Sequence, residues 1–591
     1  MMEPSRIEMR SIIKIKDYLT RNERLKPDIR ENDKTPSWDG EIFVYRSASI
    51  AKKDIIGRVA VQIKGSVKVD LSQKTIKYRL ECSDFRNYLS SNGAILFVIY
   101  MKGYDDCKIY FNALLPFDLI KLIEQFGEQK TKTIELHEFP KDDPIEVINI
   151  FLNFIANQKL QGGTIDHKFL SLDNIGKLGF EIDGFHIEYT GIGLNNITDV
   201  INYSLRHPTY IYVQPKGFNI KVPVGKINAD QILSDIKSPI TVEGKTFYSS
   251  YKISHEIGKK ILTIGKSLNF FLDTGKFTFK LSGSLLEQVT DIKFLIALYS
   301  NQKIEINGAL LPKRLPNNPT EDTADIKKLK DHLYELEKIK STLEILGVNI
   351  DLEIDKLSNQ ELDYLFYLVS AVLYNESVPL GINNMPGIGN LTIGNLIITL
   401  ICKKADGDKY ELLNFFGDHD LYCKCLNDGK DVILSPYIQL KKDVFMTISN
   451  INYVKIVDSI KNAPKSTTQD ELANQLVLEM LKAYDGQKEK NLQLLESAQE
   501  IMRWLSEQST LDSKVSTLNM LQIVKRMREF SPEELNQISE IKHNTTDVAT
   551  LIGTSILLES FVEARLHYDR LPEDHRKEFD MYPIVKLWIG K

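Results

Sequence analysis

The sequence that decides the fold of the N-terminal part reads Trp38-Asp39-Gly40-Glu41-Ile42-Phe43-Val44-Tyr45 and, further on, Val59-Ala60-Val61-Gln62-Ile63-Lys64-Gly65. Both stretches are short and rich in β-branched and aromatic residues, which is typical of strands, and a polar hairpin joins them. Because side chains alternate along a strand, Asp39 shares a face with Glu41, and Gln62 shares a face with Lys64. If the two strands pair, two carboxylates, an amide and an ammonium group meet at one end of a sheet. That set suits a hard cation beside a phosphate group.

Each of these four side chains has an expected role beside a bound cation and a phosphate group. Asp39 is the best metal ligand, because a carboxylate at a strand end beside Gly40 leaves room for an ion and a substrate. Gln62 offers its amide oxygen, a neutral ligand, and Lys64 orients the attacking water or stabilises phosphate charge. Glu41 supplies further negative charge if its face is the site face, and is otherwise a solvent-facing acid. The cation expected here is Mg²⁺ or Mn²⁺.

The order of these residues also resembles a known family. Asp39 followed by Gln62-x-Lys64 resembles the core of the PD-(D/E)XK nuclease superfamily, with Gln62 in the place of the usual acid. Four segments are similar to an uncharacterised bacterial family placed in that superfamily: residues 32–40, 57–65, 84–89 and 114–119.

This resemblance covers residues 1–162, about a quarter of the 591 residues. It implies an α/β restriction-endonuclease-like core and a magnesium-dependent endonuclease, with Asp39, Gln62 and Lys64 as catalytic residues. Glu41 is added to this catalytic set because its carboxylate would make up the missing negative charge. A further acid carried by a helix is common in the superfamily, and Glu23 or Glu31 is the candidate for it.

The charge around the motif favours a polyanion. The whole chain carries a net charge of −5, so any attraction to nucleic acid must come from a local patch. From Arg46 to Arg86 the sequence holds ten basic residues and four acidic ones. Such a run is usually a solvated face, but beside a metal site it indicates phosphate contacts. We expect duplex DNA to contact Lys52, Lys53, Arg58, Lys68, Lys74 and Arg86.

Cysteine usage and hydropathy indicate the compartment. The five cysteines are few and odd in number, which favours a reducing cytoplasm over a disulfide framework. The first residues are charged and lack the apolar core of a signal peptide. The longest apolar run, residues 364–374, is too short to cross a membrane, so we expect a buried helix there and no membrane contact.

Hydrophobic periodicity predicts the elements of the N-terminal region. Residues 94–100 form a continuous apolar run, which indicates a central strand buried on both faces. Asp143-Pro144-Ile145-Glu146 is a strong helix start. The other expected elements are a helix over 7–20, a connector over 21–34, a hairpin over 67–80, a helix over 83–89, a strand over 108–114 and a helix over 116–126.

The whole chain is expected to be multidomain α+β. Residues 1–162 form the nuclease-like domain, 163–318 a mostly β domain, 319–465 a helical hairpin plus strands, and 466–591 a helical domain. Within the third region, residues 325–346 and 359–374 are expected to pair as helices, Gly387-x-Gly389 to form a turn, and residues 444–449 a strand. Residues 319–591 are the expected route to a homo-oligomer or a protein partner.

Three functional hypotheses remain open at this point. The first is a metal-dependent nuclease acting on DNA, with a role in bacterial defence against foreign DNA that rests on family analogy. The second is a non-catalytic binding or sensor protein whose core lost its metal when glutamine replaced the acid. The third makes the later domains the active part and the nuclease-like part a docking platform.

Overall fold

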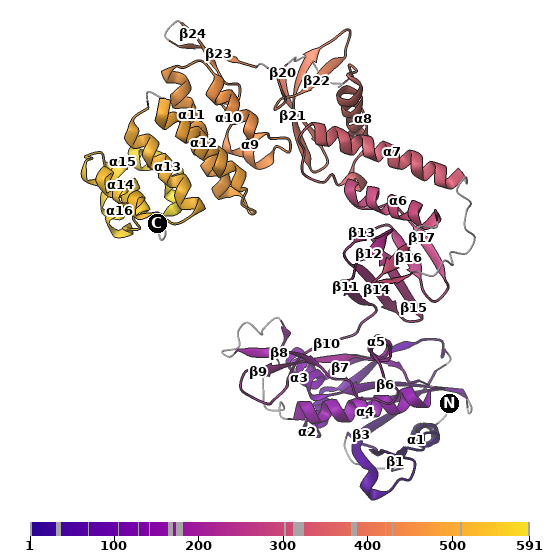
Figure 1. Ribbon diagram of the computed structural model, residues 1–591. Coiled ribbons are helices and arrows are strands. Elements are labelled where there is room, and N and C mark those ends of the chain that lie inside the picture. The colour runs from indigo at the N-terminus through magenta and orange to yellow at the C-terminus, as the bar shows by residue number, and fades with distance from the viewer. Residues whose placement is uncertain are drawn as a thin grey trace. The chain divides into compact units, whose positions relative to one another are not determined.

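The chain is a multidomain α+β protein that folds into two compact units (Figure 1). A computed structural model describes residues 3–30, 37–68, 70–103, 106–127, 129–140, 142–162, 170–172, 181–300, 303–310, 324–379, 387–419, 421–427, 430–508 and 511–588. The first unit comprises Met1–Ile236, Tyr251–Thr263 and Phe270–Lys276, and the second comprises Lys237–Ser250, Ile264–Asn269 and Phe277–Lys591. The expected boundary at residues 162 and 163 stays a prediction, because residue 163 lies outside the described residues.

The first unit is built on a seven-stranded sheet with the strand order β1-β2-β3-β5-β6-β7-β4. Strands β3 and β5 run parallel, and every other neighbouring pair in this sheet is antiparallel. The strands are β1 (Leu25–Ile29), β2 (Gly40–Tyr45), β3 (Ile55–Val67), β4 (Thr75–Glu81), β5 (Ala94–Lys102), β6 (Asp106–Leu114) and β7 (Thr131–Glu138). The helices are α1 (Pro4–Thr20), α2 (Cys82–Ser90), α3 (Pro116–Phe126) and α4 (Pro144–Gln161), and a short 3₁₀ turn, η1 (Lys52–Asp54), precedes β3.

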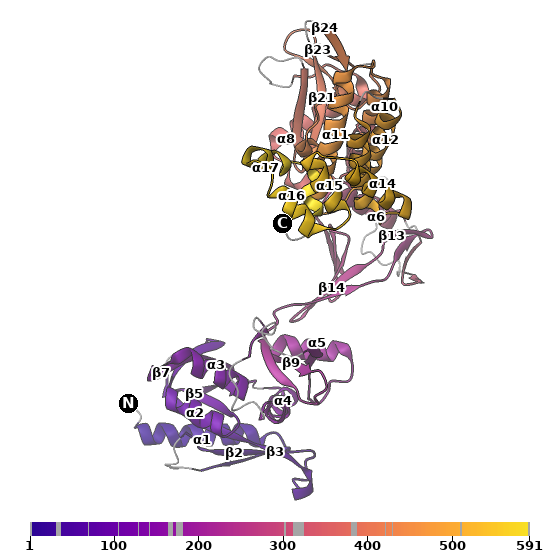
Figure 2. The same cartoon turned by 90° about the vertical axis from the view of Figure 1, so that its left-hand side faces the viewer.

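Helices cover both faces of this sheet. Apolar residues of α1 and α4 pack on one face with Ile95, Phe97 and Ile99 of β5, and those of α2 and α3 pack on the other with Leu96 and Val98. Helix α1 lies alongside β3 in both views (Figure 1 and Figure 2). The prediction of a central strand buried on both faces is therefore confirmed for β5.

Local sequence explains where the helices begin and how closely α1 approaches the sheet. Asp143 caps α4 by accepting hydrogen bonds from the backbone N–H groups of Ile145 and Glu146, at 3.0 and 3.1 Å. A Cβ atom on Gly65 of β3 would lie 2.1 Å from the Oγ of Ser11 on α1. Only glycine therefore lets α1 pack directly on this part of β3.

The expected hairpin over residues 67–80 is wrong. Strand β3 continues to Val67 in parallel pairing with β5, while β4 crosses to the far edge of the sheet and pairs with β7. Strands β1 and β7 were not predicted. In β1 the sequence Leu25-Lys26-Pro27-Asp28-Ile29 contains proline and charged residues, and its pairing with β2 at the sheet edge overrides that local signal.

A small second sheet docks on α3 and α4 within the first unit. It is formed by β8 (Ile182–Ile187), β9 (Thr209–Pro215) and β10 (Val222–Ile227), and α5 (Ile197–Arg206) lies between β8 and β9. The carboxylate of Asp118 on α3 accepts hydrogen bonds from the hydroxyl of Tyr210 and from Lys226 Nζ, the latter at 2.9 and 3.0 Å. The hydroxyl of Tyr212 donates to Asn157 Oδ1 on α4 at 2.5 Å.

A run of short strands follows in the middle of the chain: β11 (Ile232–Ile236), β12 (Ile240–Val242), β13 (Lys245–Tyr248), β14 (Tyr251–Glu256), β15 (Lys259–Ile264), β16 (Leu268–Phe271) and β17 (Lys276–Phe279). In the second unit, α6 (Leu285–Tyr299) carries a buried carboxylate, Asp291. It accepts hydrogen bonds from the hydroxyl of Tyr248 and from the backbone N–H groups of Lys266 and Ser267. This group therefore ties α6 to β13 and to the connection between β15 and β16.

The next part of the second unit contains the predicted helix pair. Helices α7 (Ala324–Ile345) and α8 (Asn359–Tyr374) share one apolar core, which confirms that prediction. The predicted turn at Gly387-x-Gly389 is wrong, because both glycines lie in β20, and the predicted strand over 444–449 is wrong, because α9 occupies most of it. The remaining elements here are β18 (Ile304–Ile306), β19 (Ala309–Leu310), β20 (Gly387–Ile393), β21 (Leu396–Lys404), β22 (Tyr410–Asn414), β23 (Cys423–Asn427), β24 (Lys430–Leu434) and α9 (Lys442–Thr447).

The C-terminal region is all-helical, as expected from its sequence (Figure 1). Its helices are α10 (Tyr453–Asn462), α11 (Thr467–Gly486), α12 (Leu492–Gln508), α13 (Ser513–Met527), α14 (Pro532–His543), α15 (Val548–Leu557), α16 (Phe561–Tyr568) and α17 (Glu573–Phe579). Among the described residues, no helix combines the length and the apolar content that crossing a membrane would require.

The Asp118 network predicts how firmly the small sheet is held. In Asp118→Asn the charge that Tyr210 and Lys226 contact is lost, so the free energy of opening β9 should fall by about 2 kcal/mol. Amide hydrogen exchange of β9 measures this free energy. The control is Asp17→Asn, whose partner Arg21 is 60% exposed, and it should change stability by less than about 0.5 kcal/mol. Equal effects in the two variants would contradict the proposed role of Asp118.

Candidate active site

Asp39 lies where β3 changes partners. Val61 is the last residue of β3 that pairs with β2, opposite Gly40, and the first that pairs with β5, opposite Ile95. Beyond that point, Oδ2 of Asp39 accepts a hydrogen bond from the backbone N–H of Ile63 at 2.5 Å and another from Gln62 Nε2 at 2.7 Å. Two donors on one oxygen fix the orientation of this carboxylate.

The backbone that carries Asp39 is tightly constrained. Ser37 has a positive φ of 70°, which is uncommon outside glycine, and Gly40 has a φ of 151°. A Cβ atom on Gly40 would lie 2.2 Å from the carbonyl oxygen of Asp28 in β1. The space that the sequence suggested for an ion beside Gly40 is therefore filled by the neighbouring strand. Strained backbone of this kind often accompanies a functional site.

Gln62 and Lys64 point to the same face of β3, the face that α2 covers. The side chain of Gln62 is 3% exposed, and its Oε1 makes no hydrogen bond with any described residue. Lys64 is half-buried opposite Val98 of β5, and it forms no ion pair within the described part of the chain. The structure thus brings Asp39 and Gln62 into contact and places Lys64 on the same face.

Glu41 reaches the site face but has another partner. The strand register puts it opposite Ala60, on the face of Gln62. Its carboxylate forms an ion pair of 3.2 Å with Arg58, and the two side chains are 37% and 69% exposed. Of the two helix-borne acids considered, Glu23 lies beyond α1 at the opposite end of β2 from Asp39, and Glu31 lies outside the described residues.

A different acidic residue, Asp84 on α2, lies near Asp39, although no role was expected for it. Asp84, Asn87 and Tyr88 lie at positions i, i+3 and i+4 of this helix and so share one face. The hydroxyl of Ser37 donates to Asp84 Oδ1 at 2.7 Å and accepts from Asn87 Nδ2 at 2.8 Å. The i, i+3, i+4 spacing within the family-like segment 84–89 was the available sequence signal.

Tyr88 lies beside both carboxylates. Its side chain is 0% exposed, and its hydroxyl is buried without a hydrogen-bond partner among the described residues. Burial and then the negative charges of Asp84 and Asp39 raise the pKa of Tyr88 far above its ordinary value. The phenol therefore remains protonated and can act only as a neutral donor or acceptor at this site.

The six basic residues expected to bind DNA do not form one patch. Lys52 and Lys53 lie on η1 at the tip of the β2–β3 hairpin, about 20 Å or more from Asp39 if each strand residue advances about 3.3 Å. Arg58 lies between the tip and Gln62, on the site face. Lys68 follows the other end of β3, where its ammonium group lies 5.5 Å from the ring centre of Tyr100.

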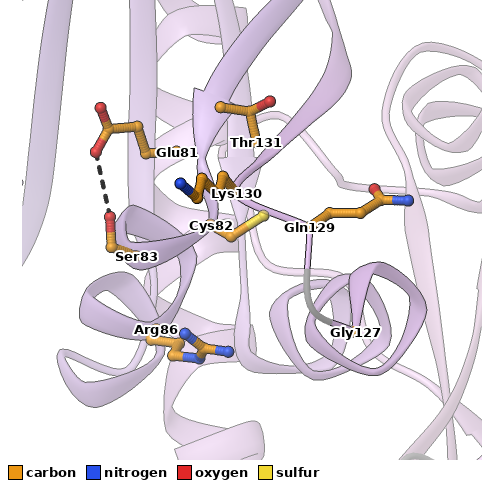
Figure 3. A pocket seen from close by; sticks show the side chains of 8 residues that line it. All are labelled: Glu81, Cys82, Ser83, Arg86, Gly127, Gln129, Lys130 and Thr131. Atoms are coloured by element: carbon orange, nitrogen blue, oxygen red, sulfur yellow. Dashed lines mark hydrogen bonds between the residues drawn. The ribbon is translucent and has the colours of Figure 1, made fainter.

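The last two basic residues lie on other elements. Lys74 directly precedes β4, at the far edge of the sheet from β2. Arg86 lies on α2 and lines a pocket of about 530 Å³ at the helix start, which Figure 3 shows. None of Asp39, Gln62 and Lys64 lines this pocket, so it is separate from the candidate active site.

The donor set suits a hard cation better than a soft one. No group of three His, Cys, Asp or Glu side chains that could hold a metal was found in the described part of the chain. The site offers carboxylate and amide oxygens instead, and Mg²⁺ commonly binds through one or two carboxylates while keeping several waters. The cysteines of the chain lie on other elements, apart from Cys82, which is buried at the start of α2.

The comparisons with known proteins give no relatives. No family model, no curated protein and no solved structure matches the chain.

The constraint at Gly40 can be tested directly. Gly40→Ala should destabilise the β1–β2 pairing by about 3 kcal/mol, because the added Cβ overlaps the backbone of Asp28. Gly103→Ala is the matched control: Gly103 also has a positive φ, of 72°, but a Cβ there meets no atom within 4 Å. The control should lose only about 1 kcal/mol from its backbone conformation. Amide exchange of β2 measures the difference, and similar losses would show that β1 does not press on Gly40.

Proposed function

We propose that the seven-stranded sheet of the first unit carries a metal-dependent nuclease that cleaves phosphodiester bonds in duplex DNA. The observation that supports this most is the fixed carboxylate of Asp39, held 2.7 Å from Gln62 with Lys64 two residues further on the same face of β3. The order of the elements also supports it: helix α1, the antiparallel strands β1, β2 and β3, the edge strand β4, helix α2, and β5, which runs parallel to β3. With β4 counted as an addition at the far edge, this is the order that the resemblance to the PD-(D/E)XK superfamily implies.

Each residue of the site would have its own role in hydrolysis. Asp39 and the carbonyl oxygen of Gln62 would hold the cation, which when bound lowers the pKa of a water and neutralises phosphate charge. The N–H groups of Ile63 and Gln62 keep the Asp39 carboxylate in place, so little reorganisation is needed during reaction. Lys64 supplies a positive charge for a phosphate oxygen or orients the attacking water.

The exposure of the site face indicates how DNA would approach. Gln62 is buried under α2, whereas Arg58, four residues towards the hairpin tip, is 69% exposed. A substrate therefore reaches Asp39 along the β2–β3 hairpin, past Arg58 and towards Lys52 and Lys53. Asp54 accepts hydrogen bonds from Ser47 and Ser49, which orders the tip on which these lysines lie.

A second candidate function is a nucleic-acid-binding or scaffold protein without catalysis. It is favoured by the hydrogen bond from Gln62 to Asp39, because a neutral amide there supplies one negative charge fewer than an acid would. The two proposals share the basic hairpin and differ in whether magnesium supports cleavage. A role in defence against foreign DNA remains a prediction of the family resemblance.

Cleavage of supercoiled plasmid in the presence of magnesium tests the nuclease proposal. Asp39→Asn removes the charge that holds the cation, and Lys64→Ala removes the charge that faces the phosphate, so each should lower the cleavage rate at least about 100-fold. Lys64→Ala should keep its magnesium affinity, whereas Asp39→Asn should lose it. Glu41→Gln is the matched control on the same face and should cut at nearly the parental rate.

Gln62 is the most informative position in the same assay. Gln62→Leu removes a donor to Asp39 and should not cut. Gln62→Glu places two carboxylates in contact, so without metal one of them should take up a proton or the site should loosen, and magnesium should stabilise this variant more than the parent. If Asp39→Asn and Lys64→Ala cut as well as the parent, the nuclease proposal fails; if no protein cuts but all bind duplex, the binding proposal replaces it.

Salt-dependent DNA binding tests the path along the hairpin. The double variant Lys52→Glu, Lys53→Glu should weaken duplex binding and reduce the slope of log affinity against log salt by about 1.8, since each phosphate contact contributes about 0.9. The double variant Lys68→Glu, Lys74→Glu changes the net charge equally but lies away from this path, so its slope should match the parent. Equal slopes in all three proteins would mean that DNA does not follow the hairpin.

A further inference from the structure

Building on the proposed nuclease, one feature of the site lies beyond the Asp-Gln-Lys motif. Asp84 lies on α2 and contacts the segment that carries Asp39. Its only hydrogen bond with the described residues comes from Ser37 and is made to Oδ1, so Oδ2 has no partner among them. Ser37 and Asp39 are separated by one residue, which means that one short, strained segment connects both carboxylates.

Tyr88 provides an independent observation that a ligand belongs between these carboxylates. Tyr88 is 0% exposed and its hydroxyl has no partner among the described residues, although the charges of Asp84 and Asp39 both act on it. A buried hydroxyl without a hydrogen bond is unfavourable, and native structures normally satisfy such groups with protein, water or an ion. A carboxylate would be a ready acceptor, yet neither carboxylate accepts from it.

We propose that Asp84 and Asp39 together bind one hydrated divalent cation, and that the hydroxyl of Tyr88 accepts or donates a hydrogen bond to a water of that cation. Two carboxylates and retained waters are the coordination that Mg²⁺ prefers, because it loses its water reluctantly. Gln62 Nε2 donates to Asp39, and Oε1 of the same amide has no hydrogen bond within the described residues, so it is available as a neutral ligand. Asp84 thereby supplies the second negative charge that Gln62 does not provide and that Glu41, paired with Arg58, does not bring.

The experiment is calorimetric titration of the full chain with MgCl₂ and, separately, MnCl₂. Asp84→Asn keeps an oxygen that can accept from Ser37, so the fold is preserved while the charge is lost. The affinity of Asp84→Asn for either cation should fall at least about tenfold, and so should that of Asp39→Asn. The affinity of Tyr88→Phe should fall about tenfold, because this variant loses the hydrogen bond to a water of the cation. Asp17→Asn, whose carboxylate pairs with Arg21, is the control and should bind within about twofold of the parent, since losses of ten- to a hundredfold mark the residues that hold or support a metal.

The outcomes separate this inference from the nuclease proposal. If Asp39→Asn loses the cation but Asp84→Asn retains it, the role of Asp84 is refuted while the nuclease proposal stands. If both variants lose the cation but the parent cuts no nucleic acid, the cation site stands and the nuclease proposal fails. If the parent binds neither cation, the two-carboxylate site is refuted. Amide exchange of α2 checks that each variant remains folded.

Discussion

The first unit depends on one strand that serves two partners in succession. β3 hydrogen-bonds to β2 on one edge as far as Val61 and to β5 on the other edge from Val61 onward. Beyond the end of β2, the edge of β3 that faced β2 has no partner strand. The backbone N–H of Ile63 on this edge needs another acceptor, because an unpaired N–H in a buried strand is costly. Asp39 is that acceptor. The carboxylate that we propose as a metal ligand is thus also part of the sheet, since it completes the hydrogen bonding of β3 where its pairing changes.

This double role explains why the surrounding backbone is so tightly specified. Gly40 is required because β1 presses against it, and Gly65 is required because α1 packs on β3 at that point. Both glycines stand beside the motif residues, yet neither makes room for a ligand. Their absence of a side chain lets a strand and a helix approach, and those approaches fix the two ends of the segment that displays Asp39, Gln62 and Lys64. The rigidity of the site therefore comes from packing around it as well as from the two hydrogen bonds that Asp39 accepts.

Short-range patterns in the sequence predicted much of this, and long-range pairing accounts for most of what they missed. Apolar runs and caps located β5, α3 and α4, and alternation placed Gln62 and Lys64 on one face. The prediction of a hairpin over 67–80 was wrong because β4 pairs with β7, which lies fifty or more residues further along the chain. The sequence of residues 67–80 contains no signal of that distant partner. The six basic residues are close in sequence, but a long β3 and a sheet crossing separate them in space. Asp84 was counted only as a charge, because its approach to Ser37 depends on how α2 lies across the sheet.

The glutamine in place of the usual acid is consistent with this arrangement rather than an exception to it. Two carboxylates at the 2.7 Å separation of Gln62 and Asp39 could not both stay ionised without a cation between them. The amide of Gln62 instead donates to Asp39. The part of β3 where pairing passes from β2 to β5 is therefore stable with or without a metal ion. The second carboxylate, Asp84 on α2, lies outside the β2–β3 pairing. It accepts a hydrogen bond from Ser37, whose hydroxyl in turn accepts one from Asn87. With the second negative charge on α2 and not on β3, the stability of the sheet would not depend on whether the cation is bound. If the cation left, the unneutralised carboxylate would be that of Asp84, which lies near the surface of the site and outside the pairing of β2 with β3.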